Sequence, residues 1–502
     1  MKRSFLTGVA AAALLATSSY AALAAGKKGK VEAAPPPPPA WLDTLTIDGF
    51  VEGGVTINPG QPVNKVNWGH LYTDRANWPT FNGALLTVQR PLDPKAEGID
   101  LGFKVQGQVG MDARYNHFLG VLDYAVKSRT QIALIEAHGL VHLPILTKGG
   151  IDLKIGKFVT YNGAEVIPAK DNLFYTHSYI FNFGPFLHTG AMATTHVTDW
   201  LDVYTGVTTG VNTSIGWPGD NNRAASFHGG FGLNLLDGQL TIMAFTHAGP
   251  ENPKMVDPYL NLTFPAGVPH WPDIGTFCSC GPSTTWRYYN NLTATWKPTE
   301  NLTLITDISY MRDDGWNAVN GLGMSQAYAG WVDGLLGTPF GLLPRRPRGV
   351  DAYGVAQYAS YKVNDQFKVN GRIEYWRDNN NFFAGAFPGY FDMVNAMHGF
   401  QSAAIFQPFG NANNANGTSY LALTLGTTIT PDVPDMPLIK GIILRPEVRW
   451  DVAVNNAAPF FGGPRTSVPY GLTASPPPTI GVTQKRSQGL IAMDVIIPFS
   501  IR

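Results

Sequence analysis

The feature that most restricts the fold of this chain is the alternation of short and long connectors between segments of similar length. From Thr44 onward, segments of about ten residues alternate apolar and polar side chains with period two. Their number is about sixteen, an even number, with ranges 44–57, 81–90, 99–112, 131–143, 149–158, 186–197, 200–212, 224–235, 239–248, 284–297, 301–312, 351–362, 366–377, 418–429, 440–453 and 486–499. This regular pattern indicates an all-β chain in one large unit.

The connectors fall into two classes that follow each other along the chain. Short turns are expected at 146–148, 198–199, 236–238, 298–300 and 364–365, and two longer connectors of the same class at 91–98 and 431–439. The intervening loops run from about ten to about forty residues. A soluble β-sandwich has no reason to gather its long loops at one end, whereas an outer-membrane barrel has short periplasmic turns and long extracellular loops. We therefore predict a transmembrane antiparallel β-barrel of about sixteen strands.

Several predicted strands carry an apolar face and a charged face. Between Leu444 and Asp451 one face holds Leu, Pro, Val and Trp, and the other holds Arg, Glu, Arg and Asp. The segments 367–376 and 99–109 divide in the same way. In a soluble sandwich the apolar face would line the interior, so period two alone does not decide which face meets water.

Two tryptophans favour a membrane on the apolar side. Trp286 and Trp296 begin and end one face of a predicted strand. Their separation of ten residues corresponds to roughly 33 Å along a strand, which a tilt of about 40° reduces to about 25 Å of height. That height matches the apolar band between two aromatic girdles, although two tryptophans in a large sandwich core are the alternative.

The charge balance limits the kinds of partner. Lys and Arg (36) cancel Asp and Glu (36), and only 14% of the residues are charged, against about 25% in an average soluble protein. A neutral chain has no long-range field that would attract nucleic acid, so we expect no nucleic-acid partner. No apolar run of 18 residues predicts a transmembrane helix after the N-terminus, so the expected contact with outer-membrane lipid rests on the barrel pattern.

The N-terminus has the pattern of an export signal. Lys2 and Arg3 precede an apolar stretch, 5–15, and Ala22 and Ala24 are small residues of the kind that signal peptidase recognises. We predict a signal peptide over 1–24, a Pro-rich periplasmic linker over 25–43 and the barrel over 44–502. The protein is then expected in the outer membrane of a Gram-negative-type bacterium; a membrane-anchoring N-terminal helix is the alternative.

No catalytic motif is recognisable in the sequence. It lacks a Gly-x-Ser-x-Gly elbow, a His-Glu-x-x-His motif and a phosphate-binding loop. His138 and His142 share one strand face about 13 Å apart, too far for one metal ion without other ligands. For Cys278 and Cys280 a loop disulfide, an intermolecular bond and a metal site are all open, but no second Cys pair or His-x-His lies nearby to favour metal. We expect no enzymatic activity, no metal and no cofactor.

The charged faces of the predicted strands would line a water-filled lumen. About sixteen strands generally leave an aqueous passage, which predicts passive diffusion of small polar solutes or ions. The alternative is that these charges pair with one another in a plugged, structural lumen. The predicted pore-lining residues are Asp48, Glu52, Asp100, Lys104, Arg287, Lys368, Arg372, Glu374, Arg445, Glu447 and Arg449.

The third long loop, 159–185, is the predicted constriction of this pore. It contains Glu165, Lys170 and Asp171, followed by an aromatic run over 175–183 that is too apolar for solvent. Folding into the lumen would bury part of that run. The alternative is a loop that caps the barrel or contacts a neighbouring subunit.

Several stretches resemble the putative β-barrel porin-2 (OmpL-like) family of outer-membrane β-barrel proteins. The resemblance spans essentially the whole mature barrel and implies an outer-membrane barrel that acts as a passive channel; it carries over no catalytic residue. The stretches are Gly49 to Gly54, Leu86 to Asp93, Met111 to Tyr115, Val141 to Ile145, Tyr175 to Gly184, His188 to Gly190 and Gly210 to Thr213.

Two other functions are consistent with the same sequence. A non-conducting structural or adhesion barrel would use its long extracellular loops, such as 313–349 and 379–417, to bind partners. A soluble secreted β-sandwich, enzyme or carbohydrate-binding protein, would be recovered without detergent. By analogy with sixteen-stranded porins a homotrimer is also plausible, although the sequence identifies no interface strand.

Overall fold

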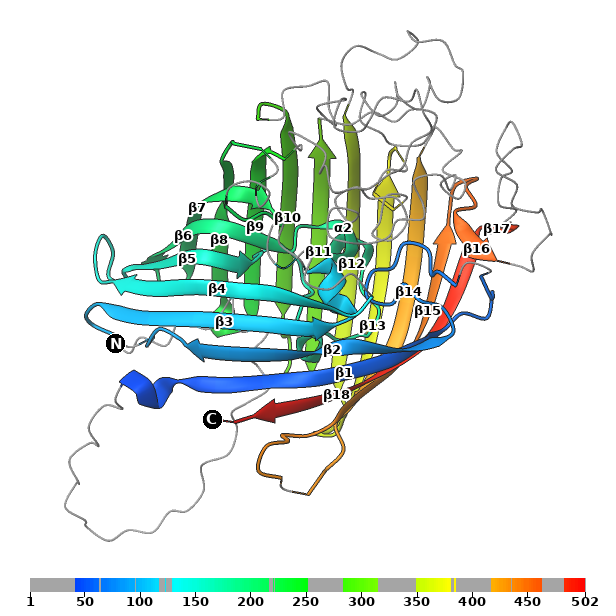
Figure 1. The fold of residues 1–502 in the computed structure, drawn as a ribbon, viewed down its shortest axis with the longest axis horizontal. Coiled ribbons are helices and arrows are strands. Elements are labelled where there is room, and N and C mark those ends of the chain that lie inside the picture. The colour runs from blue at the N-terminus through cyan, green and yellow to red at the C-terminus, as the bar shows by residue number, and fades with distance from the viewer. Residues whose placement is uncertain are drawn as a thin grey trace.

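The described strands form a closed antiparallel barrel of sixteen strands in a computed structural model (Figure 1). The structure describes residues 41–501 apart from 63–64, 95, 117–121, 123–128, 216–219, 221, 252–282, 315–348, 381–382, 385–416, 435 and 463–482. The barrel strands are β1 (Thr46–Ile57), β2 (Trp78–Arg90), β3 (Asp100–Gly110), β4 (Gln131–Leu143), β5 (Ile151–Val159), β6 (Leu187–Thr198), β7 (Leu201–Val211), β8 (Ser226–Leu235), β9 (Leu240–Pro250), β10 (Trp286–Trp296), β11 (Leu302–Asp313), β12 (Val350–Lys362), β13 (Phe367–Asp378), β14 (Thr418–Ile429), β15 (Ile443–Ala453) and β18 (Ser487–Ser500).

Neighbouring strands of the barrel are consecutive in sequence, and the ring closes where β1 pairs with β18. Figure 1 shows these first and last strands side by side. The predicted fold class and the alternation of short and long connectors are confirmed, with strand ends displaced by a few residues. The additional strands β16 (Phe460–Gly462) and β17 (Thr483–Lys485) were not predicted; they pair with each other in the connection between β15 and β18.

The structure decides which face of the strands meets lipid. On β15, Val448 is 51% exposed, whereas the neighbouring Arg449 is 2% exposed. Aliphatic side chains point outward in the same way on β14 and β18, where Leu423, Leu425 and Ile491 are exposed. The charged residues therefore face the interior, and the low charge content follows from a whole face of each strand being given to the apolar bilayer.

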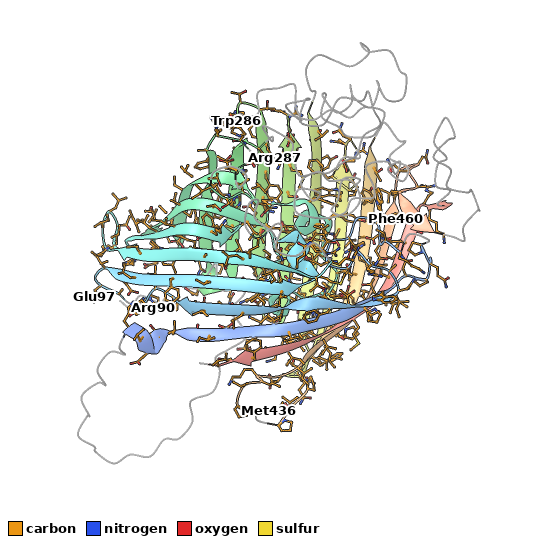
Figure 2. The ribbon with its side chains drawn as sticks, viewed as in Figure 1. Arg90, Glu97, Trp286, Arg287, Met436 and Phe460 are labelled. Atoms are coloured by element: carbon orange, nitrogen blue, oxygen red, sulfur yellow. The ribbon has the colours of Figure 1, made fainter. Side chains whose placement is uncertain are left out.

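The two tryptophans of β10 lie at opposite ends of that strand and are both exposed. Trp286 is 42% and Trp296 is 44% exposed. Figure 2 places Trp286 at the end of the barrel that carries the long loops, and Met436 on a connector at the other end. These positions agree with the two aromatic girdles that flank the apolar band of an outer-membrane barrel.

A cationic substitution on the outward face should be costly in a depth-dependent way. Leu423 is an exposed aliphatic residue near the middle of β14. We expect Leu423→Arg to lower the free energy of unfolding by about 2–4 kcal/mol, measured by denaturant unfolding in lipid vesicles, because a charge at the bilayer midplane is poorly solvated. Val363, in the short turn after β12, is the matched control, and Val363→Arg should cost about 0–1 kcal/mol. Equal costs for the two variants would contradict the orientation of the barrel.

The described residues do not include the predicted signal peptide, most of the predicted linker, or Cys278 and Cys280. The last residues assigned to the linker form a short 3-10 helix, η1 (Trp41–Thr44), whose Trp41 Nε1 donates to the carbonyl oxygen of Leu101 at 2.9 Å. Within the part of the chain that the structure describes, no helix has the length and hydropathy to cross a membrane.

Candidate pore and its inward-folded loop

The connection between β5 and β6, residues 160–186, folds into the barrel and is called the β5–β6 loop below. It contains the 3-10 helix η3 (Ala169–Asp171) and the short helix α2 (Tyr179–Phe183), which lies within the ring of strands in Figure 1. Ser178 caps α2 by accepting a hydrogen bond from the Phe181 amide at 3.1 Å. Tyr175 and Tyr179 are 3% and 1% exposed, so the aromatic run is buried rather than facing solvent.

A glycine of the barrel wall makes room for the loop. A Cβ atom at Gly54 of β1 would lie 2.6 Å from the Tyr175 ring, which is closer than packed atoms approach. The Tyr175 hydroxyl donates to Asn82 Oδ1 on β2 at 2.9 Å. The loop thus packs directly against the first two strands on one side of the lumen.

Glu165 joins the β5–β6 loop to strands on another side of the lumen. Its carboxylate lies 2.7 Å from Arg372 Nη1 of β13 and accepts from Tyr358 of β12 at 2.9 Å. It also accepts from His177 Nδ1 at 2.7 Å and from the Ser178 amide at 3.1 Å, both within the loop. Burial alone would raise the pKa of Glu165, but the Arg372 charge and these hydrogen bonds outweigh burial and lower that pKa to about 2. Glu165 is therefore ionised at neutral pH.

The middle of the loop is also held by β15. Arg445 Nη1 donates to the carbonyl oxygens of Ala169 at 2.7 Å and Asn172 at 2.8 Å. Glu447 accepts from the amides of Tyr175 at 2.7 Å and Thr176 at 3.0 Å. The backbone groups of these buried loop residues thus find hydrogen-bond partners on the barrel wall.

The central arginines of the predicted pore wall are buried in ion pairs. Arg372 Nε lies 2.8 Å from Glu374, whose carboxylate also lies 2.7 Å from Arg449 Nη1. Arg449 pairs in addition with Asp451 at 2.8 Å, and Arg445 pairs with Asp494. All three guanidinium groups are at most 2% exposed. Their charges are neutralised by adjacent carboxylates, so they contribute little field to open water.

A second set of predicted lining residues keeps access to solvent. Lys368 is exposed near the turn-side end of β13, and Asp48 on β1 is half-buried. Other predicted residues lie in ion pairs with at least one partly exposed member: Lys104–Glu136 at 2.5 Å, Arg287–Asp313 at 2.7 Å, Lys170–Asp171 at 2.9 Å and Arg90–Asp100 at 2.5 Å. Glu52, in contrast, is buried, and its carboxylate lies 3.7 Å from Arg445 Nη2.

The first long loop, 58–77, also contributes to the interior and was not predicted. His70 Nε2 lies 3.0 Å from Asp451, and Trp68 Nε1 donates to the Tyr420 hydroxyl at 3.2 Å. Asp74 pairs with Arg114 at 2.8 Å in the 3-10 helix η2 (Asp112–Tyr115). Burial would raise the pKa of Asp74, but the guanidinium charge holds it below its usual value. The sequence signal that could have indicated this inward folding is the group of apolar residues around Trp68, which is comparable to the aromatic run of the β5–β6 loop.

The closed barrel, its outward apolar face and its polar interior with an inward loop define an outer-membrane porin. The chain matches the family described as "Putative beta-barrel porin-2, OmpL-like" over residues 44–499, and it belongs to that family. No curated protein matches the chain by sequence.

Several solved outer-membrane proteins are similar to this chain at low identity. The channel DcaP of Acinetobacter baumannii has a TM-score of 0.45 and 9% identity over 91% of this chain and 97% of that chain. OmpT of Vibrio cholerae has a TM-score of 0.42 and 10% identity over 90% and 97%. OprD of Pseudomonas aeruginosa has a TM-score of 0.39 and 12% identity over 91% and 94%.

Proposed function

We propose that this porin allows small polar solutes or ions to diffuse passively across the outer membrane, with the β5–β6 loop as its constriction. The observation that supports the constriction is that this loop is bonded across the lumen, to Asn82 on one side and to Arg372 and Arg445 on others. The proposed lining of the pore consists of the charged wall residues together with Glu165, Lys170 and Asp171 of the loop. We propose no enzymatic activity, which rests on membership of a porin family.

The rival function is a non-conducting structural or adhesion barrel. The observation that favours it is the burial of Arg372, Arg445 and Arg449 in ion pairs across the loop and the wall. Single-channel recording in planar bilayers distinguishes the two functions. Passive diffusion predicts discrete conductance steps from the refolded full chain; their absence in protein whose folding is verified by heat-modifiable electrophoretic mobility would favour the rival.

Ion selectivity should depend on the exposed lysine rather than on the buried arginines. Lys368→Glu replaces an exposed cation near the turn-side end of β13 by an anion. Since this changes the local charge by two units in water, we expect the cation-to-anion permeability ratio to rise roughly two- to fourfold. The reversal potential in a salt gradient measures this ratio. Lys440→Glu, on the exposed connector between β14 and β15, is the matched control and should leave it nearly unchanged; equal shifts would contradict a lumenal position for Lys368.

The N-terminal segments and the assembly are proposals of the same kind. We infer that residues 1–24 are removed on export, so N-terminal sequencing of the mature protein should begin at Ala25. We also infer a homotrimer, from the class of barrel alone. Its test is the mass of the detergent-solubilised protein, and a monomeric mass would exclude the trimer.

A further inference from the structure

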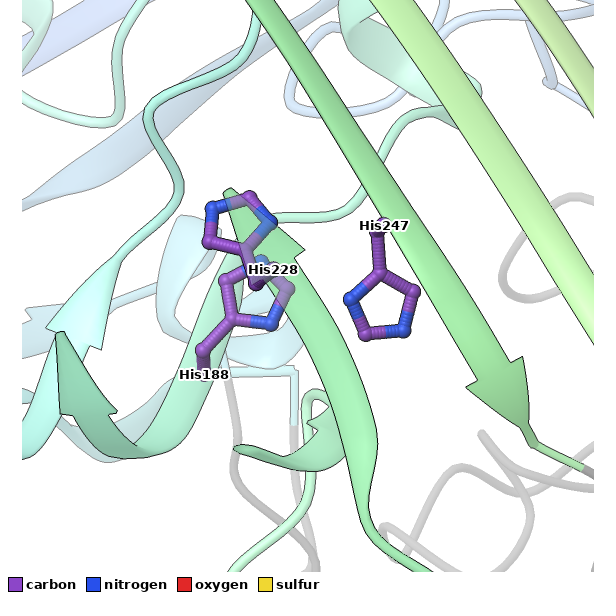
Figure 3. A group of neighbouring side chains, drawn as sticks. All are labelled: His188, His228 and His247. Atoms are coloured by element: carbon purple, nitrogen blue, oxygen red, sulfur yellow. The ribbon is translucent and has the colours of Figure 1, made fainter. Parts of the chain in front are cut away.

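Three histidines from three different strands meet inside the barrel, near the end that carries the long loops. His188 lies near the start of β6, His228 near the start of β8 and His247 near the end of β9. Each offers a ring nitrogen, and these nitrogens lie within 4.8 Å of one another. All three residues are fully buried. Figure 3 shows the rings of His188 and His228 lying over each other, with His247 beside them.

The nitrogens that face one another lack ordinary hydrogen-bond partners. Neither ring nitrogen of His228 makes a hydrogen bond of normal geometry, and neither does Nδ1 of His247. His188 Nε2 has only a 3.3 Å contact with the Thr160 hydroxyl. Leaving such polar atoms buried without partners is unfavourable, because they lose the hydrogen bonds that water would give them. Three neutral imidazoles in this arrangement keep ring nitrogens without hydrogen-bond partners unless a ligand binds between them.

The opposite nitrogens of two of these rings are held by acceptors. His188 Nδ1 lies 3.1 Å from the carbonyl oxygen of Gly210, and His247 Nε2 lies 2.7 Å from a carboxylate oxygen of Glu251. Both acceptors require an N–H on the nitrogen they face. His247 Nδ1 therefore carries a lone pair with no donor, and the lone pair of His188 Nε2 meets only the long contact with the Thr160 hydroxyl. A backbone carbonyl or carboxylate on the distal nitrogen is the usual support of a metal-ligating histidine.

The wall beside the cluster is shaped to admit that carboxylate. Gly210 of β7 has φ of +134°, and a Cβ atom there would lie 2.6 Å from Glu251 Oε2. A side chain at this position would displace Glu251 from His247. Glu251 also accepts from the Val211 amide at 3.0 Å and the Ser226 hydroxyl at 3.1 Å, which fix its position.

We propose that His188, His228 and His247 bind one divalent transition-metal cation of the class that prefers imidazole, such as Zn²⁺. Tetrahedral coordination with metal–nitrogen distances of about 2.0–2.1 Å places the ligand nitrogens about 3.4 Å from one another. The distances between the three histidine nitrogens therefore need to shorten by at most about 1.4 Å, which rotation of the rings can supply. Calcium and magnesium are disfavoured because they select oxygen ligands. The buried Glu251 carboxylate offsets part of the cation's charge. A bound ion links β6, β8 and β9 at the outer end of the barrel.

This site departs from the expectation, drawn from the sequence, of no metal. The three histidines are far apart in the sequence and have no ligand spacing that a motif would reveal. The register of the barrel brings the three rings together. Strands β8 and β9 pair His228 with His247, and β7 lies between β8 and β6, which carries His188.

The test uses the untagged full chain refolded in detergent and depleted of metal. We expect it to bind one equivalent of Zn²⁺ in competition with a chromophoric chelator, and to give nitrogen couplings in the electron paramagnetic resonance spectrum of bound Cu²⁺. His228→Gln should weaken Zn²⁺ binding by more than about 100-fold, and Glu251→Gln by about 10–100-fold. His142→Gln, which alters a lumen-facing histidine paired with Asp152, is the matched control and should bind as the native chain does.

Two further outcomes bear on the proposal. The double variant C278S/C280S should retain full affinity; loss of binding there would assign the metal to the cysteines and overturn the histidine site. Substoichiometric Zn²⁺ binding by the native chain, or unchanged binding by His228→Gln, would also overturn it. If His228→Gln does not fold, as judged by heat-modifiable mobility, the nitrogen couplings of the native chain and the Glu251→Gln affinity decide.

Discussion

Glu165→Ala should release the β5–β6 loop and raise the single-channel conductance at least about twofold, because a sixteen-stranded barrel without an inward loop has a wider passage. The substitution removes the carboxylate that joins the loop to Arg372 and Tyr358. It also removes the acceptor for His177 and the Ser178 amide. Breaking a buried ion pair typically costs about 3–5 kcal/mol, which is enough to shift the loop from its inward position.

The controls for this prediction separate the loop from the fold. Glu300→Ala removes an exposed carboxylate in the connector between β10 and β11 and should leave the conductance unchanged. Glu165→Gln keeps the shape and some hydrogen bonds, so an intermediate conductance is expected. If Glu165→Ala gives a folded barrel with the native conductance, the loop is not the constriction.

The strands could be predicted from the sequence because their signal is local. Period-two alternation is visible within a single segment, and the segment around Arg449 already showed which residues share a face. The direction of the apolar face needed the connector lengths as a second observation, since Val448 would be buried in a soluble sandwich and is exposed here.

The interior could be predicted only in part because its contacts are not local. Arg372 and Glu165 were both selected, one as wall and one as loop, yet nothing in their sequence positions shows that they pair. The folding of the first loop, with His70 against Asp451, has no periodic signal. The meeting of His188 with His228 likewise depends on the barrel register, which is set by pairing along entire strands.

The second large effect is expected at Arg445, which joins β15, β18 and η3. Its Nε donates to Asp494 at 3.0 Å and its Nη1 to two carbonyl oxygens of the loop, while Glu52 lies 3.7 Å away. Arg445→Met leaves two buried carboxylates without their cation. We expect the free energy of unfolding to fall by about 3–5 kcal/mol, measured by denaturant unfolding in lipid vesicles. Arg486→Met, which removes an exposed arginine, should change it by less than about 0.5 kcal/mol.

A double variant shows which of the two losses dominates. Arg445→Met with Asp494→Leu replaces the buried ion pair by apolar side chains, a change that is often neutral when the packing is preserved. Glu52 still loses its cation in this variant, and the carbonyl oxygens of Ala169 and Asn172 still lose Arg445 as a donor. Stability that recovers most of the way would therefore assign the cost of Arg445→Met to the unpaired carboxylate. A double variant as unstable as the single one would assign that cost to the groups that still lose Arg445, which are the buried Glu52 and the loop carbonyl oxygens around η3.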